Sequence, residues 1–199
     1  MRIGILTFHA SHNFGSNLQN YALQQFLLSE GHIVETINLR NEKQKYMYHH
    51  PLHRGRRSPV FWKVLARFLD PQWLISECKG WNKFENFLNT YLILTKEYVD
   101  WDTIKKDLPK NNYNAIIVGG DQIWNTFCYD FDWSYYLPDD IRPIKKIAYG
   151  PSFGSFLIKM REDNSLVSTI NKYLDDFDYL SVREKDASSF LQIQLNRSV

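Results

Sequence analysis

The sequence predicts an α/β protein with a Rossmann-like open sheet, mainly parallel and with helices on both faces. Short apolar segments suited to β-strands alternate with segments of helical periodicity. Residues 2–39 contain a strand, a helix and a strand, a unit whose crossover makes the two strands parallel. Four turns rich in small and polar residues follow expected strands. We expect one domain over residues 1–199, long enough for a sizeable core.

The first strand is expected at Arg2–Phe8, and a polar, glycine-containing turn follows it. A helix is expected from about Ser16 to Glu30, ending at Gly31, and a second strand at His32–Leu39. The apolar residues at helical spacing are Leu18, Tyr21, Ala22 and Phe26.

Residues 41–112 are interpreted as a mainly helical insertion after the second strand. Its first part, Asn41–Pro59, contains proline and glycine and is expected to be an exposed loop, followed by a short helix at Val60–Leu69. Asp70 and Pro71 suit the N-cap and first position of a further helix, expected to be interrupted near Gly80.

The alternation of strands and helices returns after the insertion. Strands are expected at Tyr113–Val118, Lys146–Tyr149 and Tyr179–Val182, with a helix from about Asn164 to Phe177. Aromatic residues at every second position over 127–135 predict an extended segment, either a half-buried strand or flap or a platform for sugar rings.

Charge and cysteine content exclude some classes of protein. The formal net charge is +2, yet residues 40–67 hold eight basic residues against one acid. That stretch could contact nucleic acid, but a solvated loop is the commoner case, and the acidic remainder disfavours a nucleic-acid partner. Cys78 and Cys128 lie far apart in the sequence, and we expect both to be free thiols in a reducing compartment. No apolar run suits a signal peptide or membrane span, so we expect a cytoplasmic protein.

The polar turns at 9–15, 119–125, 150–154 and 183–186 each follow an expected strand. In an open parallel sheet the carboxyl ends of the strands share one edge, and ligands bind there. The sequence therefore predicts a site at this edge.

The turn after the first strand offers several polar groups. Asn13 and Gly15 precede the helix that carries Gln19, so this turn could bind an anion at the helix N-terminus or only cap the helix. His9 could transfer a proton or contact a phosphate, or be part of a polar loop; with His12 it lacks a third metal ligand, so no metal site is expected.

Two glycines, Gly119 and Gly120, end the buried strand before Asp121. They allow another group to approach the backbone, and Asp121 could be a general base or accept a hydroxyl, with Gln122 and Asn125 as hydrogen-bonding groups. The alternative is a structural turn in which Asp121 bonds its own backbone.

Residues 150–154 match the G-x-S-x-G pattern of hydrolases around Ser152. Every histidine lies between His9 and His53, so Ser152 has no downstream base and we reject the hydrolase interpretation. A ligand-facing loop or a plain turn is expected.

Together these motifs resemble the polysaccharide pyruvyl transferase family. The resemblance rests on Gly4–His9, Asn13–Leu23, Gly119–Asn125, Ala148–Gly154 and Ser181–Glu184, in that order. It implies half of a two-lobed, GT-B-like fold and the transfer of pyruvate from phosphoenolpyruvate to sugar hydroxyls as a ketal, in surface polysaccharide biosynthesis.

The resemblance also implies roles for individual residues. Asp121 would be the base, Arg183 an anion ligand, and His9 a further catalytic group; phosphoenolpyruvate is the donor substrate, with no other cofactor. The expected substrate-binding residues are Asn13, Gly15, Gln19, Gly119, Gly120, Gln122, Trp124, Asn125, Ser152, Arg183 and Glu184.

Members of this family continue into a second domain, whereas this sequence stops at Val199. We therefore expect a truncated domain, inactive alone, that binds a sugar or polysaccharide precursor and associates with a second lobe or with copies of itself. The alternatives are a non-catalytic sugar- or partner-binding module and a small flavodoxin-like, anion- or nucleotide-binding domain.

Overall fold

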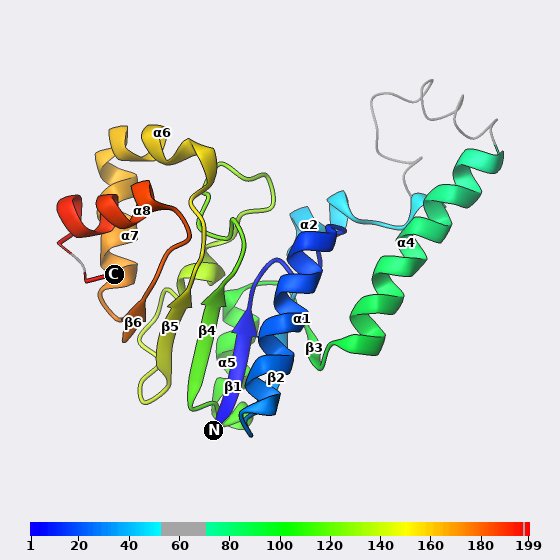
Figure 1. Cartoon of the computed structure of the whole chain (residues 1–199), viewed down its shortest axis with the longest axis horizontal. Helices are drawn as coiled ribbons and strands as arrows, with labels where there is room; N and C mark the ends of the chain where they lie inside the picture. The colour runs from blue at the N-terminus through cyan, green and yellow to red at the C-terminus, as the bar shows by residue number, and fades with distance from the viewer. Residues whose placement is uncertain (53–70, 197) are drawn as a thin grey trace.

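Six parallel strands form the open sheet at the centre of the molecule, in the order β3-β2-β1-β4-β5-β6 (Figure 1). The structure, a computed structural model, describes residues 1–52, 71–196 and 198–199. The strands are β1 (Arg2–Leu6), β2 (Ile33–Leu39), β3 (Leu94–Tyr98), β4 (Ala115–Gly119), β5 (Lys145–Tyr149) and β6 (Tyr179–Leu180). This order confirms the expected Rossmann-like α/β architecture.

Helices cover both faces of the sheet, with α1 on one face and α5 and α7 on the other (Figure 1). The α-helices are α1 (Phe14–Ser29), α2 (Glu42–Met47), α4 (Pro71–Tyr91), α5 (Trp101–Asn111), α6 (Leu157–Glu162), α7 (Asn164–Leu174) and α8 (Lys185–Ser189). Short 3-10 helices lie at η2 (Trp133–Tyr136) and η3 (Gly154–Phe156), and a π-helical turn at η4 (Phe190–Gln194).

The central strands are apolar on both sides because both faces are covered. Every residue of β4 is buried, and Ile5 of β1 pairs in register with Ile117 of β4. The main core lies between the sheet and α5 and α7, where Ile104, Ile170 and Trp124 are almost completely buried.

Of the four apolar residues of α1 expected at helical spacing, Leu18, Ala22 and Phe26 are exposed and Tyr21 is half-buried. Leu18 and Phe26 are 56% and 59% exposed. The buried face is polar instead, because Gln24 hydrogen-bonds the Thr36 hydroxyl (3.1 Å) and both backbone groups of Ile93 (2.9 and 3.1 Å). Gln24 thereby joins α1 to β2 and to the residue that precedes β3.

The helical insertion expected at 41–112 is wrong in part. β3 adds an edge strand to the sheet, and α5 covers the sheet, so residues from 94 onward belong to the α/β layers. Helix α4 runs through Gly80 without interruption, and the loop expected from Asn41 begins with α2. The helix expected at 60–69 and most of the basic stretch lie outside the described residues.

The extended segment expected from Phe127 is also wrong. Turns and η2 occupy residues 127–136, and the aromatic residues divide between surface and core: Phe127 and Tyr129 are exposed, whereas Phe131 and Tyr135 are buried. The segment is not extended, but it covers part of the core, because Phe131 and Tyr135 belong to the core and Trp133 packs against it. Over the described ranges, no helix is long and apolar enough to cross a membrane.

Candidate functional site

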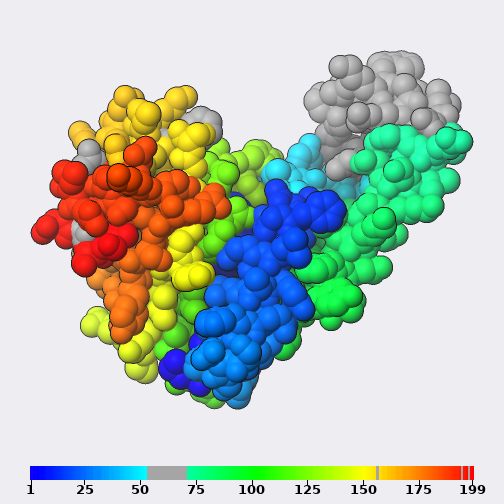
Figure 2. Space-filling view, in the orientation of Figure 1, coloured from blue at the N-terminus to red at the C-terminus, as the bar shows by residue number. Residues whose placement is uncertain are grey.

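The four polar turns meet at the carboxyl edge of the sheet, as parallel pairing of β1, β4, β5 and β6 requires. The chain leaves β1 toward β2 and later returns to pair β4 on the other side, so the topological switch point lies between β1 and β4. In the space-filling view the surface above this edge is hollowed between α6 and α4 (Figure 2).

Asp121 lies at this switch point and joins the two sides. One of its carboxylate oxygens accepts a hydrogen bond from the Ser16 hydroxyl at the start of α1, and the other accepts from the backbone N–H of Gln122 (2.7 Å). Both carboxylate oxygens of Asp121 therefore accept hydrogen bonds from within the protein. The bond from Gln122 is the structural turn expected as the alternative to a catalytic role, and the bond from Ser16 crosses the switch point.

Gly119 and Gly120 allow close contacts that any side chain would prevent. Both have positive φ, +152° and +84°. A Cβ on Gly119 would overlap the backbone carbonyl of Tyr149 in β5, and a Cβ on Gly120 would overlap the Gln19 amide. The two glycines thus allow the backbone of β5 and the Gln19 side chain to approach the main chain closely, as the sequence predicts.

Backbone hydrogen bonds hold the later turns together. The Ser152 N–H donates to the Asp121 carbonyl (2.8 Å), the Trp124 N–H donates to the Ser152 carbonyl (3.2 Å), and the Arg183 N–H donates to the Pro151 carbonyl (3.2 Å). Because β4, β5 and β6 are neighbours, three segments far apart in the sequence form one surface.

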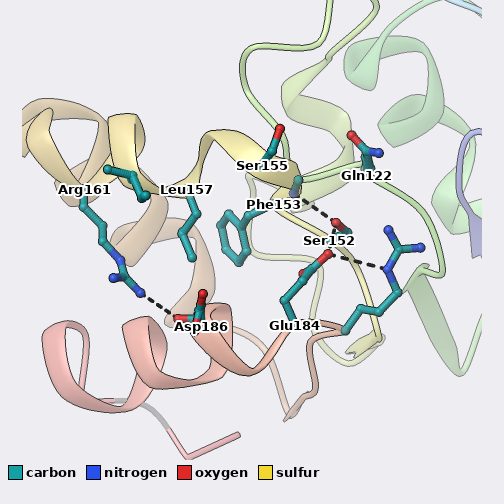
Figure 3. Close-up of a pocket in the computed structure, with 11 residues that line it drawn as sticks. Gln122, Ser152, Phe153, Ser155, Leu157, Arg161, Glu184 and Asp186 are labelled. Carbon is teal, nitrogen blue, oxygen red and sulfur yellow. Dashed lines mark hydrogen bonds and ion pairs between the residues drawn. The ribbon is translucent and has the colours of Figure 1, made fainter.

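A pocket of about 400 Å³ opens between the turn after β5, α6 and the turn after β6 (Figure 3). Its polar lining includes four of the expected residues and three others. These are Gln122, Ser152, Arg183 and Glu184, with Ser155, Arg161 and Asp186. Phe153, Leu157 and Ile158 supply apolar surface.

Ser152 and Glu184 form the central contact in this pocket. The buried Ser152 hydroxyl donates to Oε1 of Glu184 and accepts the Gly154 backbone N–H (2.9 Å). The same Oε1 lies 3.5 Å from Nε of Arg183, while Oε2 of Glu184 is buried with no hydrogen-bond partner among the described residues. The Arg161 guanidinium donates to the Asp186 backbone carbonyl (2.6 Å), closing the far side.

Asn13 and Asn125 organise their own turns. The Asn13 side chain caps α1 by accepting the N–H groups of Gly15 (2.8 Å) and Ser16 (3.3 Å), the capping alternative of the sequence. Asn125 is buried, and its Oδ1 accepts the Phe127 N–H (3.1 Å).

Two expected site residues are buried away from the pocket. His9 is 0% exposed, with Nε2 2.9 Å from Oδ1 of Asn38, and burial lowers the pKa of its imidazole to about 4. Trp124 is also 0% exposed: its indole stacks on Tyr136, with centroids 5.1 Å apart, and donates to the Tyr135 carbonyl (3.0 Å). Neither side chain can touch a ligand here, so these two assignments are corrected to internal packing.

His9 instead begins a polar chain that reaches α4. The Nε of Arg40 donates to Oδ1 of Asn38 (3.3 Å), and its terminal nitrogens donate to both oxygens of Glu85 (3.2 and 3.1 Å). Nε2 of His12 lies 3.1 Å from the same carboxylate. Burial raises the pKa of Glu85, but the hydrogen bonds from His12 and Arg40 outweigh it and the net shift is downward.

Cys128 does not provide a nucleophile. Burial first, and then the charges of Asp130 and Asp121, raise the pKa of its thiol to about 11, so the thiol stays protonated near neutral pH. Cys78 and Cys128 are both free thiols.

Sequence reasoning missed the contribution of α6. Leu157 and Arg161 are four residues apart, so they share a helix face, and both line the pocket. The signal was their position directly after the turn at 150–154; Asp186 follows Glu184 in the same way.

Comparison with known proteins gives the family. A family model described as polysaccharide pyruvyl transferase matches residues 13–195, most of the chain. Searches of curated proteins and of solved structures returned no match. The matched region includes the turns after β4, β5 and β6 and every residue that lines the pocket. The chain therefore belongs to the polysaccharide pyruvyl transferase family.

Proposed function

We propose that this domain takes part in the transfer of pyruvate from phosphoenolpyruvate to two hydroxyls of a sugar, forming a ketal in a surface polysaccharide or its precursor. The observation that carries the proposal is the family match over a chain in which the polar turns after β4, β5 and β6 line one pocket. In this reaction two sugar oxygens bond to C2 of the donor and the C2–O bond to phosphate breaks. Of the two hydroxyl protons, one goes to C3 and the other to the departing phosphate.

The donor is an anion and needs positive charge. Arg183 suits this task because its side chain is 51% exposed at the pocket and pairs only loosely with Glu184, at 3.5 Å. A guanidinium presents several N–H donors in a planar fork that matches phosphate and carboxylate oxygens. We assign Arg183 to the donor's phosphate or carboxylate.

Asp121 holds the two halves of the sheet edge in register through Ser16. We propose that its contribution is positional, and that a second lobe, as in two-lobed members of the family, closes over the hollow between α6 and α4 (Figure 2). This lobe would supply further cationic groups for the donor and exclude water from the reaction.

The test is an assay of the purified protein with phosphoenolpyruvate and a panel of methyl glycosides, following phosphate release and the pyruvate ketal by mass spectrometry. Arg183→Gln should raise KM for phosphoenolpyruvate about tenfold or more, since a hydrogen bond to a charged group is lost. Arg142→Gln is the matched control, because Arg142 is an exposed arginine paired with Asp140 before β5. Equal kinetics for the two variants would refute the role of Arg183.

A non-catalytic sugar-binding module is the second candidate. The pocket places two arginines and two carboxylates together, so its formal charge is balanced, as suits a neutral ligand. Saturable binding of a glycoside without phosphate release, with phosphoenolpyruvate present, would favour this candidate.

A further inference from the structure

The pocket beside Glu184 has the chemistry of a site for a neutral polyhydroxylated ligand. Arg161 and Arg183 lie with Glu184 and Asp186, so the formal charge of the lining is balanced and suits a neutral acceptor, while the half-exposed Arg183 can still contact the donor. A sugar hydroxyl both donates and accepts, and one hydroxyl can bridge a carboxylate and a guanidinium. Leu157 and Ile158 provide apolar surface for the C–H face of a ring.

Glu184 is the carboxylate with spare hydrogen-bonding capacity at this site. Ser152 and Arg183 both approach Oε1, which leaves Oε2 buried and without a partner among the residues described. A buried carboxylate oxygen without a hydrogen bond is costly, which favours a ligand that can donate a hydrogen bond to it. The terminal torsion of a glutamate is soft, so a partial rotation turns Oε2 toward the pocket.

The Ser152 hydroxyl fixes which oxygen remains available. Because it accepts the Gly154 N–H, its own hydrogen is directed to Glu184, and the serine can follow a small rotation of the carboxylate. Asp121 offers no comparable opening, since Ser16 and the Gln122 N–H occupy its two oxygens.

We propose that Glu184, and not Asp121, binds a hydroxyl of the acceptor sugar and accepts its proton as that oxygen attacks C2 of the donor. This inference rests on the proposed pyruvyl transfer. In this step C3 already carries the proton of the first hydroxyl. The O–H bond of the second hydroxyl breaks, its oxygen bonds to C2 as the C2–O bond to phosphate breaks, and the carboxylate becomes a carboxylic acid. The proton then passes to the departing phosphate, which returns Glu184 to its ionised form. Arg183, at 3.5 Å from Oε1, keeps the donor beside the attacking oxygen.

The first arm of the test measures binding without any reaction. Calorimetric titration of the wild-type protein with methyl glycosides of galactose, glucose, mannose and N-acetylglucosamine should show saturable binding of at least one. Glu184→Ala should weaken that binding about tenfold or more, since the hydrogen bond to a charged group is lost. Glu162→Gln is the matched control, because Glu162 is an exposed carboxylate at the end of neighbouring α6.

The second arm measures turnover. Glu184→Gln should lower kcat about a hundredfold or more with a smaller change in KM for the sugar, and Glu184→Asp should restore part of it. Glu184→Gln keeps a side-chain oxygen that can accept the Ser152 hydroxyl, so its melting temperature should stay close to that of the wild type.

The outcomes separate the two claims. Pyruvyl transfer that is unchanged in Glu184→Gln would overturn this inference and leave the proposed function standing. Glycoside binding that depends on Glu184, without any transfer, would support the acceptor site and overturn the proposed function. No glycoside binding by the wild type, or equal binding by Glu184→Ala, would overturn the inference.

Discussion

Replacing different glycines by alanine should lower the free energy of unfolding by different amounts, because only some of them lie against atoms that cannot move. Gly31, with φ +79°, ends α1 with nothing within 4 Å of an added Cβ. Gly31→Ala therefore costs only the left-handed backbone strain, about 1 kcal/mol. Gly120→Ala adds the displacement of the Gln19 amide, an off-rotamer side chain worth about 1 kcal/mol, for a total of about 2 kcal/mol.

Gly119→Ala should be worse than either, because its Cβ would overlap the backbone carbonyl of Tyr149 and force β4 from β5. We expect a loss of about 3 kcal/mol or more. Gly80→Ala supplies a control of opposite sign: Gly80 lies inside α4 with open space around it, so alanine should stabilise the protein by roughly 0.5–1 kcal/mol.

Urea unfolding followed by circular dichroism gives these differences, provided that the slope m is the same for each variant. By melting temperature, Gly120→Ala should unfold about 4–8 °C below wild type. If Gly120→Ala matched wild type while Gly31→Ala did not, the close contact between Gln19 and Gly120 would be wrong.

Variants at three further residues test buried and partly buried groups outside the pocket. Trp124→Ala should cost about 3–5 kcal/mol in unfolding free energy, and Trp124→Phe much less; a small loss for alanine would contradict the core position. The pKa of His9 is about 4 in the folded protein against 6.5 unfolded, so the unfolded chain binds the extra proton. The free energy of unfolding should therefore fall by about 3 kcal/mol as the pH drops from 6.5 to 4. In His9→Gln this part of the pH dependence should be absent. Glu85→Gln should lower the free energy of unfolding by about 1–3 kcal/mol, because Arg40 and His12 lose their shared carboxylate; an unchanged urea midpoint would refute the pairing.

The place of the site could be predicted from the sequence, because it depends on local signals. Turns such as 119–125 and 150–154 follow apolar strands directly, and parallel pairing then brings them to one edge. The Ser152–Glu184 contact could not be predicted, since it joins turns after two strands whose adjacency is a tertiary fact.

Side-chain direction was the part that sequence patterns predicted least well. His9 and Trp124 lie in polar turns, yet both point into the protein because Asn38 and the Tyr135 carbonyl offer them partners there. Leu18 and Phe26 of α1 are exposed for a related reason: the buried position is taken by Gln24, which satisfies the backbone groups of Ile93. Such choices depend on which buried groups need hydrogen bonds, and helical spacing does not carry that information.

β3 was missed because its two faces differ little in burial. The segment Leu94–Tyr98 holds both charged and apolar residues, and only Tyr98 is buried, as is common for an edge strand. Its Lys96 pairs with Asp107 of α5 (2.5 Å) at the edge of the sheet. A polar edge strand of this kind gives no apolar run to detect, and charged residues help prevent pairing with other chains.

The most direct test of pyruvyl transfer at this sheet edge is single-turnover analysis of the wild-type protein with phosphoenolpyruvate and the glycoside that it binds most tightly. The account predicts one phosphate released for each pyruvate ketal formed, a yield that falls about a hundredfold or more in Glu184→Gln and is unchanged in Glu162→Gln. Formation of free pyruvate in place of the ketal, or release of no phosphate while the glycoside occupies the pocket, would contradict it.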